Sequence, residues 1–337
     1  MKLVNPIFVE NVRGDTVENF HRGAAIVVNY RGDAIASWGD VDRPIYARSS
    51  IKYLQAIPLV ESGAADAYHL EDQQIALACS SHSGELKHVE LVSQWLRTLG
   101  LGQEALRCGP SRPGHWPTYE SLIQSRQEAT SLHNACSGKH VGFLTTCCHL
   151  SYPLEGYTEP NHPFQIKLKE TLEDVMCVEA SVLPRAVDGC SIPVYAYPLK
   201  NIALGMTRLS PKGLGLSKQR KEALTRIREA VVRNPYYVAG TNRLDTLIID
   251  LTQGEILIKA GADGIYAGCI PKKGIGFALK IDDGTPKAAE VALGAILTAF
   301  YSFSYPTLAR LQPYFKTIIS NFSKKDTGFY RIHQGWL

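Results

Sequence analysis

The chain has 337 residues, of which 45% are hydrophobic and 20% charged, and its formal net charge is only +4. This composition is typical of a globular protein with a substantial core. The small net charge and the lack of a dense basic run argue against a nucleic-acid partner. No apolar run reaches the ~18–20 residues of a membrane span.

The N-terminal segment 1–6 lacks the apolar core of a secretory signal. We therefore expect a cytoplasmic protein with no membrane partner. Eight cysteines in a chain of this length predict reduced thiols rather than a disulfide framework.

Residues 6–47 are predicted to form strands. The apolar segments 24–30 and 34–38 flank Arg31-Gly32-Asp33, which is a β-hairpin signal with a short glycine-containing loop. The central strands are apolar on both faces, so the sheet is expected to be covered by helices.

The pattern is helical from about residue 49 to 187, with candidate helices at 50–61, 71–79, 84–99, 137–149 and 163–176. Residues 108–118 contain three prolines and two glycines, which predict a surface or lid loop.

The remaining segments predict a strand near 193–198, a polar amphipathic helix at 217–233, strands near 247–250, 255–259, 264–269 and 275–281, and an apolar helix at 288–301. Sheet patterns thus occur at both ends of the chain. We expect an α/β (α+β) fold, with a sheet covered by helices and a helical lobe. The whole chain, 1–337, is predicted to be one catalytic unit. Its sheet lobe covers about 1–48 and 191–337, and its helical lobe about 49–190.

The segment Ser49-x-x-Lys52 lies where an apolar helical pattern begins. Residues i and i+3 share a helix face, so the two side chains can touch. A serine hydroxyl needs a base to become a nucleophile, and a lysine can be that base when burial or neighbouring charge lowers its pKa. The simpler interpretation is a serine cap beside a solvated lysine.

Two further segments have the same chemical character. Ser81 lies in Ser80-Ser81-His82-Ser83-Gly84, where a helix gives way to a polar turn, and its hydroxyl can face a cleft or cap the next helix. Lys259 ends an apolar strand and is followed by Ala260-Gly261, whose small size leaves room for a ligand near the backbone. A β-turn with an exposed lysine is the alternative.

In this order the three segments resemble the Ser-x-x-Lys, Ser-x-Asn and Lys-Thr-Gly set of serine β-lactamases and penicillin-binding proteins, with serine replacing asparagine and alanine replacing threonine. A closer resemblance covers nearly the whole chain. It rests on Arg-Ser-Ser-Ile-Lys at 48–52, Ser-Ser-His-Ser-Gly-Glu at 80–85, His-Asn-Ala-Cys-Ser-Gly-Lys-His at 133–140, Asp-Gly-Cys at 188–190 and Lys-Ala-Gly-Ala-Asp-Gly at 259–264. Together these motifs resemble the Rhizobium etli-type L-asparaginases, the asparaginase II family.

The resemblance implies a β-lactamase-like fold, a homodimer, and hydrolysis of L-asparagine to L-aspartate and ammonia. By position, Ser49 matches the nucleophile with Lys52 as its partner, and Ser81 and Lys259 match a second serine–lysine pair. The oxyanion would lie on the Ser49 N–H and an N–H following Lys259. Which of the two serines carries the acyl group stays open, since each has a lysine partner.

The resemblance also implies a zinc ion bound by Cys136, Lys139 and Cys190. From spacing alone, Cys136 and His140 (i, i+4) are the more ordinary pair of zinc ligands, since lysine must lose a proton to bind metal. Buried structural cysteines are equally compatible with the spacing.

Asparagine carries an α-ammonium and an α-carboxylate, so its site should offer both charges. Asp188 is a candidate for the ammonium. The other candidates for the substrate pocket are Arg48, His140, Glu85, Arg243 and Gly261. Two alternatives to an asparaginase remain: a β-lactamase- or glutaminase-like serine hydrolase acting on another amide, and a non-catalytic zinc-dependent binding protein.

Overall fold

The computed structural model describes residues 4–336; residues 1–3 and 337, the two ends of the predicted sheet lobe, lie outside the described part. The strands are β1 (Ile7–Arg13), β2 (Thr16–Asn29), β3 (Ala34–Trp38), β4 (Pro44–Tyr46), β5 (Arg185–Val187), β6 (Pro193–Pro198), β7 (Leu257–Gly261), β8 (Ile265–Ile270), β9 (Ile275–Ile281), β10 (Ile318–Ser320) and β11 (Asp326–Ile332). The α-helices are α1 (Lys52–Gln55), α2 (Ile57–Glu61), α3 (Ala64–Ala67), α4 (Asp72–Ala78), α5 (Leu86–Thr98), α6 (Trp116–Gln124), α7 (Ser137–His149), α8 (Pro163–Met176), α9 (Leu199–Thr207), α10 (Lys218–Arg233), α11 (Pro235–Ala239), α12 (Leu244–Leu251), α13 (Pro286–Phe300) and α14 (Tyr305–Phe315). Short 3-10 helices are η1 (Arg48–Ile51), η2 (Gln103–Ala105), η3 (Ser131–His133), η4 (Ala180–Val182) and η5 (Pro271–Lys273).

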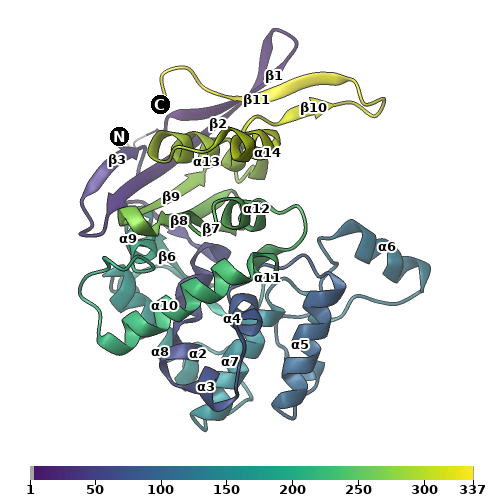
Figure 1. Ribbon diagram of the computed structural model, residues 1–337, viewed down its shortest axis with the longest axis vertical. Coiled ribbons are helices and arrows are strands. Elements are labelled where there is room, and N and C mark those ends of the chain that lie inside the picture. The colour runs from purple at the N-terminus through teal and green to yellow at the C-terminus, as the bar shows by residue number, and fades with distance from the viewer. Residues whose placement is uncertain (1–3, 337) are drawn as a thin grey trace.

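The main sheet combines strands from both ends of the chain. Over residues 4–336 it has eight strands in the order β10-β11-β1-β2-β9-β8-β7, and β3 pairs with β2. Neighbouring strands are antiparallel throughout. The predicted hairpin is confirmed, because Ala25 of β2 pairs with Trp38 of β3. Helices α13 and α14 lie on the side of the sheet away from the helical part of the molecule (Figure 1).

Strand β2 shows why the sheet is covered on both faces. Side chains alternate across a strand. Accordingly Ala24, Ile26 and Val28 face one buried cluster, while Ala25 and Val27 face the other. The predicted mixed α/β fold, with an antiparallel sheet covered by helices and a helical lobe, is confirmed.

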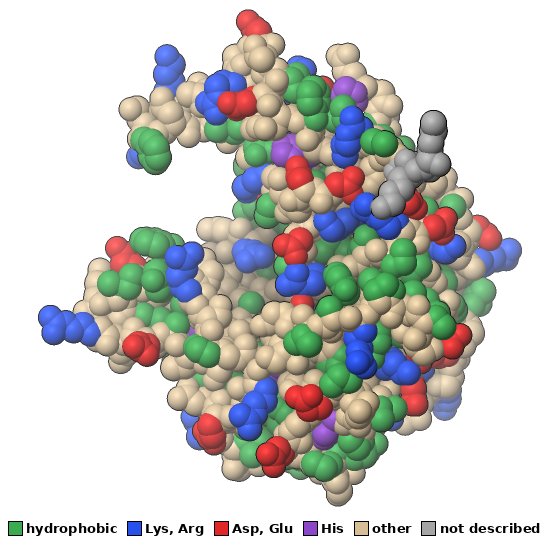
Figure 2. Space-filling view, turned by 180° about the vertical axis from the view of Figure 1, so that it is seen from behind, with side chains coloured by type: hydrophobic (Ala, Val, Ile, Leu, Met, Phe, Trp, Pro, Cys, Tyr) green, Lys and Arg blue, Asp and Glu red, His purple; other side chains and the backbone are tan. Residues whose placement is uncertain are grey.

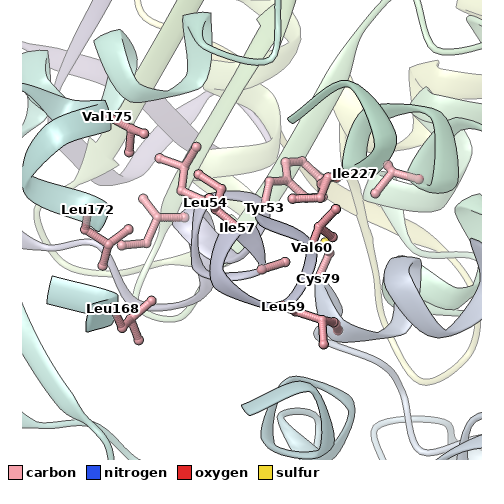
Figure 3. Packing of buried hydrophobic residues seen from close by; sticks show 14 of the residues in the cluster. Tyr53, Leu54, Ile57, Leu59, Val60, Cys79, Leu168, Leu172, Val175 and Ile227 are labelled. Atoms are coloured by element: carbon pink, nitrogen blue, oxygen red, sulfur yellow. The ribbon is translucent and has the colours of Figure 1, made fainter. Parts of the chain in front are cut away.

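The larger cluster fills the helical part. Figure 3 shows Tyr53 and Leu54 of α1 and Ile57 of α2 between Val175 of α8 and Ile227 of α10. All five side chains are fully buried. Each large aliphatic side chain contributes about 1.5–3 kcal/mol on burial. This packing fixes α1, and with it the segment that carries Ser49 and Lys52.

Three predicted elements differ from the structure. Residues 247–250 were predicted to be a strand but belong to α12, whose buried residues Leu244, Ile248 and Ile249 recur at helical spacing. The predicted loop 108–118 ends inside α6, because Pro117 occupies a first-turn position that suits proline. The predicted helix 50–61 is divided into η1, α1 and α2, with Pro58 in the first turn of α2.

Helix α10 packs against α2 and α4 of the helical part, although it lies within the range assigned to the sheet lobe. Strand β6 was predicted correctly but pairs with β4 and β5 in a separate three-stranded sheet. The exact division into lobes stays a prediction. Among the described residues, no helix combines the length and apolar character that crossing a bilayer requires.

Candidate active site

One cavity of about 390 Å³ collects most of the predicted chemistry. It is lined by residues of η1, of the turn after α4, of the 111–114 loop, of the end of β7 and of α13. Ser49, Ser81, Arg243 and Gly261 all face it. Seen from behind, the surface is hollowed between the projecting strands and the segment around α6, with charges of both signs on the inner wall (Figure 2). A larger groove of about 830 Å³ lies between α5 and α6 and contains none of the predicted serines or lysines.

The hydrogen bonds of Lys52 differ from the predicted pairing. Its Nζ donates to Ser81 Oγ at 3.2 Å, to Cys136 Sγ at 3.2 Å, to Ala135 O at 3.4 Å and to Ser80 O. No hydrogen bond joins Lys52 to Ser49 in the structure. The reason is that η1 ends at Ile51, whose φ of −107° and ψ of 16° are not helical, so α1 begins with a changed direction at Lys52. The spacing rule for one continuous helix therefore does not apply.

Lys259 is completely buried at the end of β7 and does not hydrogen-bond to Ser81. Its Nζ lies 3.3 Å from Asp245 Oδ1 and donates to Ala260 O at 3.0 Å. Burial lowers the pKa of Lys259 to about 8; Asp245 opposes this shift, whereas the charges of Lys52 and Arg243 add to it. Lys259 is thus a buried lysine that is neutral in an appreciable fraction of molecules near pH 7.

Gly261 allows β7 to approach the serine segment closely. A Cβ at this position would lie 2.4 Å from Ile265 Cγ2, 3.0 Å from Ala47 O and 3.1 Å from Ser50 N. The distance to Ile265 is shorter than real Cβ contacts, and the other two are tight, so a side chain would displace Ile265 and press on the backbone before and within η1. The small residue predicted to admit a ligand therefore brings the backbone of β7 against the backbone beside Ser49.

Cys136, Lys139 and Cys190 converge at the start of α7, below the cavity. Lys139 Nζ donates to Cys190 Sγ at 3.0 Å, and Cys190 Sγ donates to Asp188 Oδ2 at 3.2 Å. The neighbouring Cys190 thiol and the charges of Lys52 and Lys139 together lower the pKa of Cys136 well below its usual value, against the effect of burial. Burial would lower the pKa of Lys139, but the two cysteines raise it.

The donor set of this cluster fits a zinc ion. Thiolates and one nitrogen are ligands that zinc accepts, provided that the lysine is neutral. Within residues 4–336 no group of three or more His, Cys, Asp and Glu side chains is placed to hold a metal, so a site here requires Lys139. His140 Nδ1 lies 2.7 Å from Tyr157 OH and its Nε2 is buried without a hydrogen-bond partner, but in the described part of the chain His140 does not form a group of metal ligands with the two cysteines.

Arg48 connects the cysteine cluster with the cavity. Its Nε donates to Asp188 Oδ1 at 2.6 Å, and its Nη1 donates to Asp263, which lines the cavity. The φ of Arg48 is +48°, a conformation that costs of order 1–3 kcal/mol outside glycine. Asp188 itself contacts Arg48 and Cys190 and does not line the cavity. Burial would raise the pKa of Asp188, but the charge of Lys139, the hydrogen bond from Cys190 and the charge of Arg48 hold it below its usual value.

Two other predicted pocket residues lie outside the cavity. His140 is fully buried in α7, and burial lowers its pKa well below the usual value. Glu85 accepts hydrogen bonds from Thr241 N and Thr241 Oγ1, both at 2.7 Å, and from Tyr236 OH at 3.2 Å. Glu85 therefore ties the turn that follows Ser81 to the segment that leads to Arg243.

Sequence reasoning missed several residues of the site: Asp245, His82, Arg112, His133, Tyr266 and Glu290. Asp245 was hidden because its segment was interpreted as a strand. Glu290 had a detectable signal, since it is the one carboxylate in the apolar stretch 288–301.

The family comparison matches residues 9–332 to the model described as L-asparaginase II. The chain belongs to the L-asparaginase II family. No curated protein matches the chain. Among solved structures it is similar to a beta-lactamase-like protein from Bacteroides dorei, with 12% identity, a TM-score of 0.42, and coverage of 82% of this chain and 93% of that one. Membership of the L-asparaginase II family supports an asparaginase-type amidohydrolase that acts on a small molecule.

Proposed function

We propose that the protein hydrolyses L-asparagine to L-aspartate and ammonia through an acyl-enzyme on Ser49. The observation that carries this proposal is one cavity, in a chain of this family, that exposes Ser49 and Ser81 above two buried lysines. A serine hydrolase needs a nucleophile, a base for its proton and a proton donor for the leaving group.

Ser49 is the better nucleophile and Ser81 the better proton donor. Ser81 Oγ accepts a hydrogen bond from Lys52, which leaves its own hydroxyl hydrogen free to donate towards the cavity. Ser49 faces the cavity without such a bond. In this scheme Ser49 Oγ attacks the side-chain amide carbon, and the C–N bond then breaks. Ser81 donates its hydroxyl proton to the departing nitrogen, which leaves as ammonia. Lys52 donates a proton to Ser81 in turn.

Lys259 is proposed as the base, in place of the Lys52 predicted from sequence. Every contact of Lys52 is with a hydrogen-bond acceptor, as suits an ammonium, whereas the pKa of Lys259 falls to about 8. Proton transfer from Ser49 would proceed at hydrogen-bond distance or through one water. Water then cleaves the acyl-enzyme with the same groups in reversed roles.

The oxyanion is proposed to bind between the Ser49 N–H and an N–H at the end of β7, which Gly261 brings close to η1. Losing one such donor costs about 10²–10³ in rate. Cys136, Lys139 and Cys190 are proposed to hold a zinc ion. When bound, zinc would organise the pocket or position the substrate, and Arg48 and Asp188 then link its ligands to the cavity wall. A homodimer and a cytoplasmic location stay predictions.

The test is ammonia release from L-asparagine, compared with L-glutamine and with nitrocefin turnover. We expect Ser49→Ala to lose at least about 10³-fold in kcat with the fold intact, and Ser81→Ala to lose about 10²–10⁴-fold. Ser323→Ala, an exposed serine far along the chain, serves as control. Nitrocefin turnover without asparagine hydrolysis would indicate a β-lactamase-like enzyme, and a Ser49→Ala variant with unchanged ammonia release would exclude Ser49 as nucleophile.

A further inference from the structure

The cavity that Ser49 and Ser81 line also carries two charges of opposite sign. Arg243 precedes α12 and Glu290 lies in α13, and both line the cavity together with Tyr266. No step proposed for the serines or the cysteine cluster involves contact with either residue, although the charge of Arg243 helps to lower the pKa of Lys259. An amino-acid substrate carries adjacent positive and negative groups, so this cavity has the charge pattern that such a ligand needs.

The two charges are not neutralised by each other. The hydrogen bonds and ion pairs of the described residues include none for the Arg243 side chain, and they give the Glu290 side chain only Lys287, whose Nζ donates to Glu290 Oε2 at 3.0 Å. Glu290 Oε1 is left without a partner within residues 4–336. Opposite charges that line one cavity without forming a pair leave space between them for a ligand.

Burial makes the ionised carboxylate of Glu290 unfavourable unless a cation in addition to Lys287 lies close to it. Its side chain is only 15% exposed, and burial raises the pKa of Glu290 although Lys287 and Arg243 both act in the other direction. A bound ammonium would reduce this cost, because an opposite charge at close range favours the ionised carboxylate. Glu290 is thus better suited to a cationic ligand group than to solvent.

The other charged residues of the cavity are already engaged. Asp263 is paired with Arg48 and its side chain is 66% exposed. Arg112 stacks over the Tyr119 ring at 5.1 Å. Asp188, the sequence candidate for the ammonium, does not line the cavity. Glu290 is therefore the less exposed of the two cavity carboxylates, and Arg243 is the cavity arginine that does not stack on an aromatic ring.

We propose that Arg243 binds the α-carboxylate and Glu290 the α-ammonium of the amino-acid substrate, so that its side-chain amide points towards Ser49 and Ser81. The inference rests on the proposed function for the identity of the substrate. The binding of the zwitterion can nevertheless be tested without turnover. The site would favour free α-amino acids over peptides and over amides that lack either charged group.

The test is calorimetric binding of L-aspartate, succinate and β-alanine to the full-length protein. Succinate lacks the α-ammonium and β-alanine lacks the α-carboxylate. We expect the unmodified protein to bind L-aspartate ~10–100-fold more tightly than either analogue, which corresponds to one hydrogen-bonded charge lost. Glu290→Gln should remove the preference over succinate, and Arg243→Gln the preference over β-alanine.

Two exposed residues provide matched controls. Arg310→Gln and Glu155→Gln each remove a charge from an exposed side chain that makes no hydrogen bond among the described residues and does not line the cavity. Both variants should bind L-aspartate as the unmodified protein does. In turnover, Glu290→Gln should raise KM for L-asparagine with little change in kcat, because the headgroup is bound equally before and during the reaction. Arg243→Gln should raise KM as well and should also lower kcat near pH 7, because losing its charge raises the pKa of Lys259.

The outcomes separate this inference from the proposed reaction. Asparagine hydrolysis with unchanged aspartate binding in Arg243→Gln and Glu290→Gln would overturn the inference and leave the reaction standing. Selective aspartate binding that depends on both residues, without asparagine hydrolysis, would support the inference and reject the reaction. Failure of the unmodified protein to prefer L-aspartate over both analogues would also overturn the inference.

Discussion

Replacing Asp245 by asparagine tests whether the buried ammonium of Lys259 can lose its proton near neutral pH. Lys259 Nζ and Asp245 Oδ1 lie 3.3 Å apart, and the two side chains are 0% and 1% exposed. Breaking a buried ion pair usually costs 3–5 kcal/mol, because one charge is left without a partner. We expect a smaller loss of unfolding free energy here. The stranded ammonium can release its proton, since the pKa of Lys259 is already about 8.

The magnitude follows from that pKa. The pKa of Lys259, about 8, lies about one unit above pH 7, and one unit corresponds to about 1.4 kcal/mol. Releasing the proton of Lys259 at pH 7 therefore costs about 1.4 kcal/mol, which sets an upper limit on the unfolding free energy lost through the unpaired charge. Asparagine retains an oxygen for Ala260 N, which donates to Asp245 Oδ1 at 2.7 Å. The pKa of Lys259 in the folded protein lies below the ordinary lysine value of 10.5, so stability falls as pH drops from about 10 towards 8. In Asp245→Asn the unfolding free energy continues to fall below pH 8, because Lys259 stays neutral there. The unfolding free energies of the two proteins therefore differ only below about pH 8.

The assay is urea unfolding of both proteins at pH 7 and at about pH 9.5, with Asp250→Asn in the same helix as control because Asp250 is exposed. We expect a difference of about 1–2 kcal/mol at pH 7 that disappears at the higher pH. The kcat/KM profile should rise towards about pH 8 in the unmodified protein and shift to lower pH in the variant, because Lys52 and Arg243 then face Lys259 without Asp245. A loss of 3–5 kcal/mol that persists at pH 9.5 would show that Lys259 stays charged and would refute the reasoning.

Three further predictions concern other parts of the site. Cys136→Ser and Cys190→Ser should each lose stoichiometric zinc by elemental analysis while Cys177→Ser keeps it; zinc retained in both cluster variants would reject this metal site. Gly261→Ala should lower thermal stability by about 1–3 kcal/mol and kcat by at least about 10-fold, because the added methyl group displaces Ile265 and presses on the backbone before and within η1, and normal activity would contradict the proposed oxyanion geometry. Glu85→Gln should raise KM several-fold by loosening the loop before α12, measured as ammonia release at varied asparagine; an unchanged KM with lowered stability would assign Glu85 a structural role only.

The elements with the clearest periodicity could be predicted from the sequence. Helices at 137–149 and 163–176 have the predicted bounds, because helical spacing of buried residues runs through each of them. The segment 247–250 could not be assigned by the same rule, since four consecutive apolar or short residues fit a buried strand and a buried helix equally well. Only the buried positions Leu244 and Ile248, one turn apart, distinguish the two.

The serines of the site could be located by motif, but the partners of the lysines could not. Lys52 and Ser81 are 29 positions apart, and their hydrogen bond depends on how the turn after α4 packs beside α1. Likewise, nothing in the local pattern around Lys259 indicates Asp245, which approaches from a separate helix. Spacing rules describe one element at a time, whereas a buried charge finds its partner through tertiary packing.

The shared position of Lys52 decides which variant can isolate the role of the cysteine cluster. Its Nζ lies 3.2 Å from Ser81 Oγ in the cavity and 3.2 Å from Cys136 Sγ in the cluster, so a change at Cys136 alters the surroundings of the serine as well. Cys190 contacts Lys139 and Asp188 but not Lys52. Activity lost in Cys190→Ser therefore reports on the cluster with both hydrogen bonds of Lys52 still in place, although Cys190 reaches Lys52 indirectly through Cys136. The same loss in Cys136→Ser combines the cluster with the proton donor of the reaction.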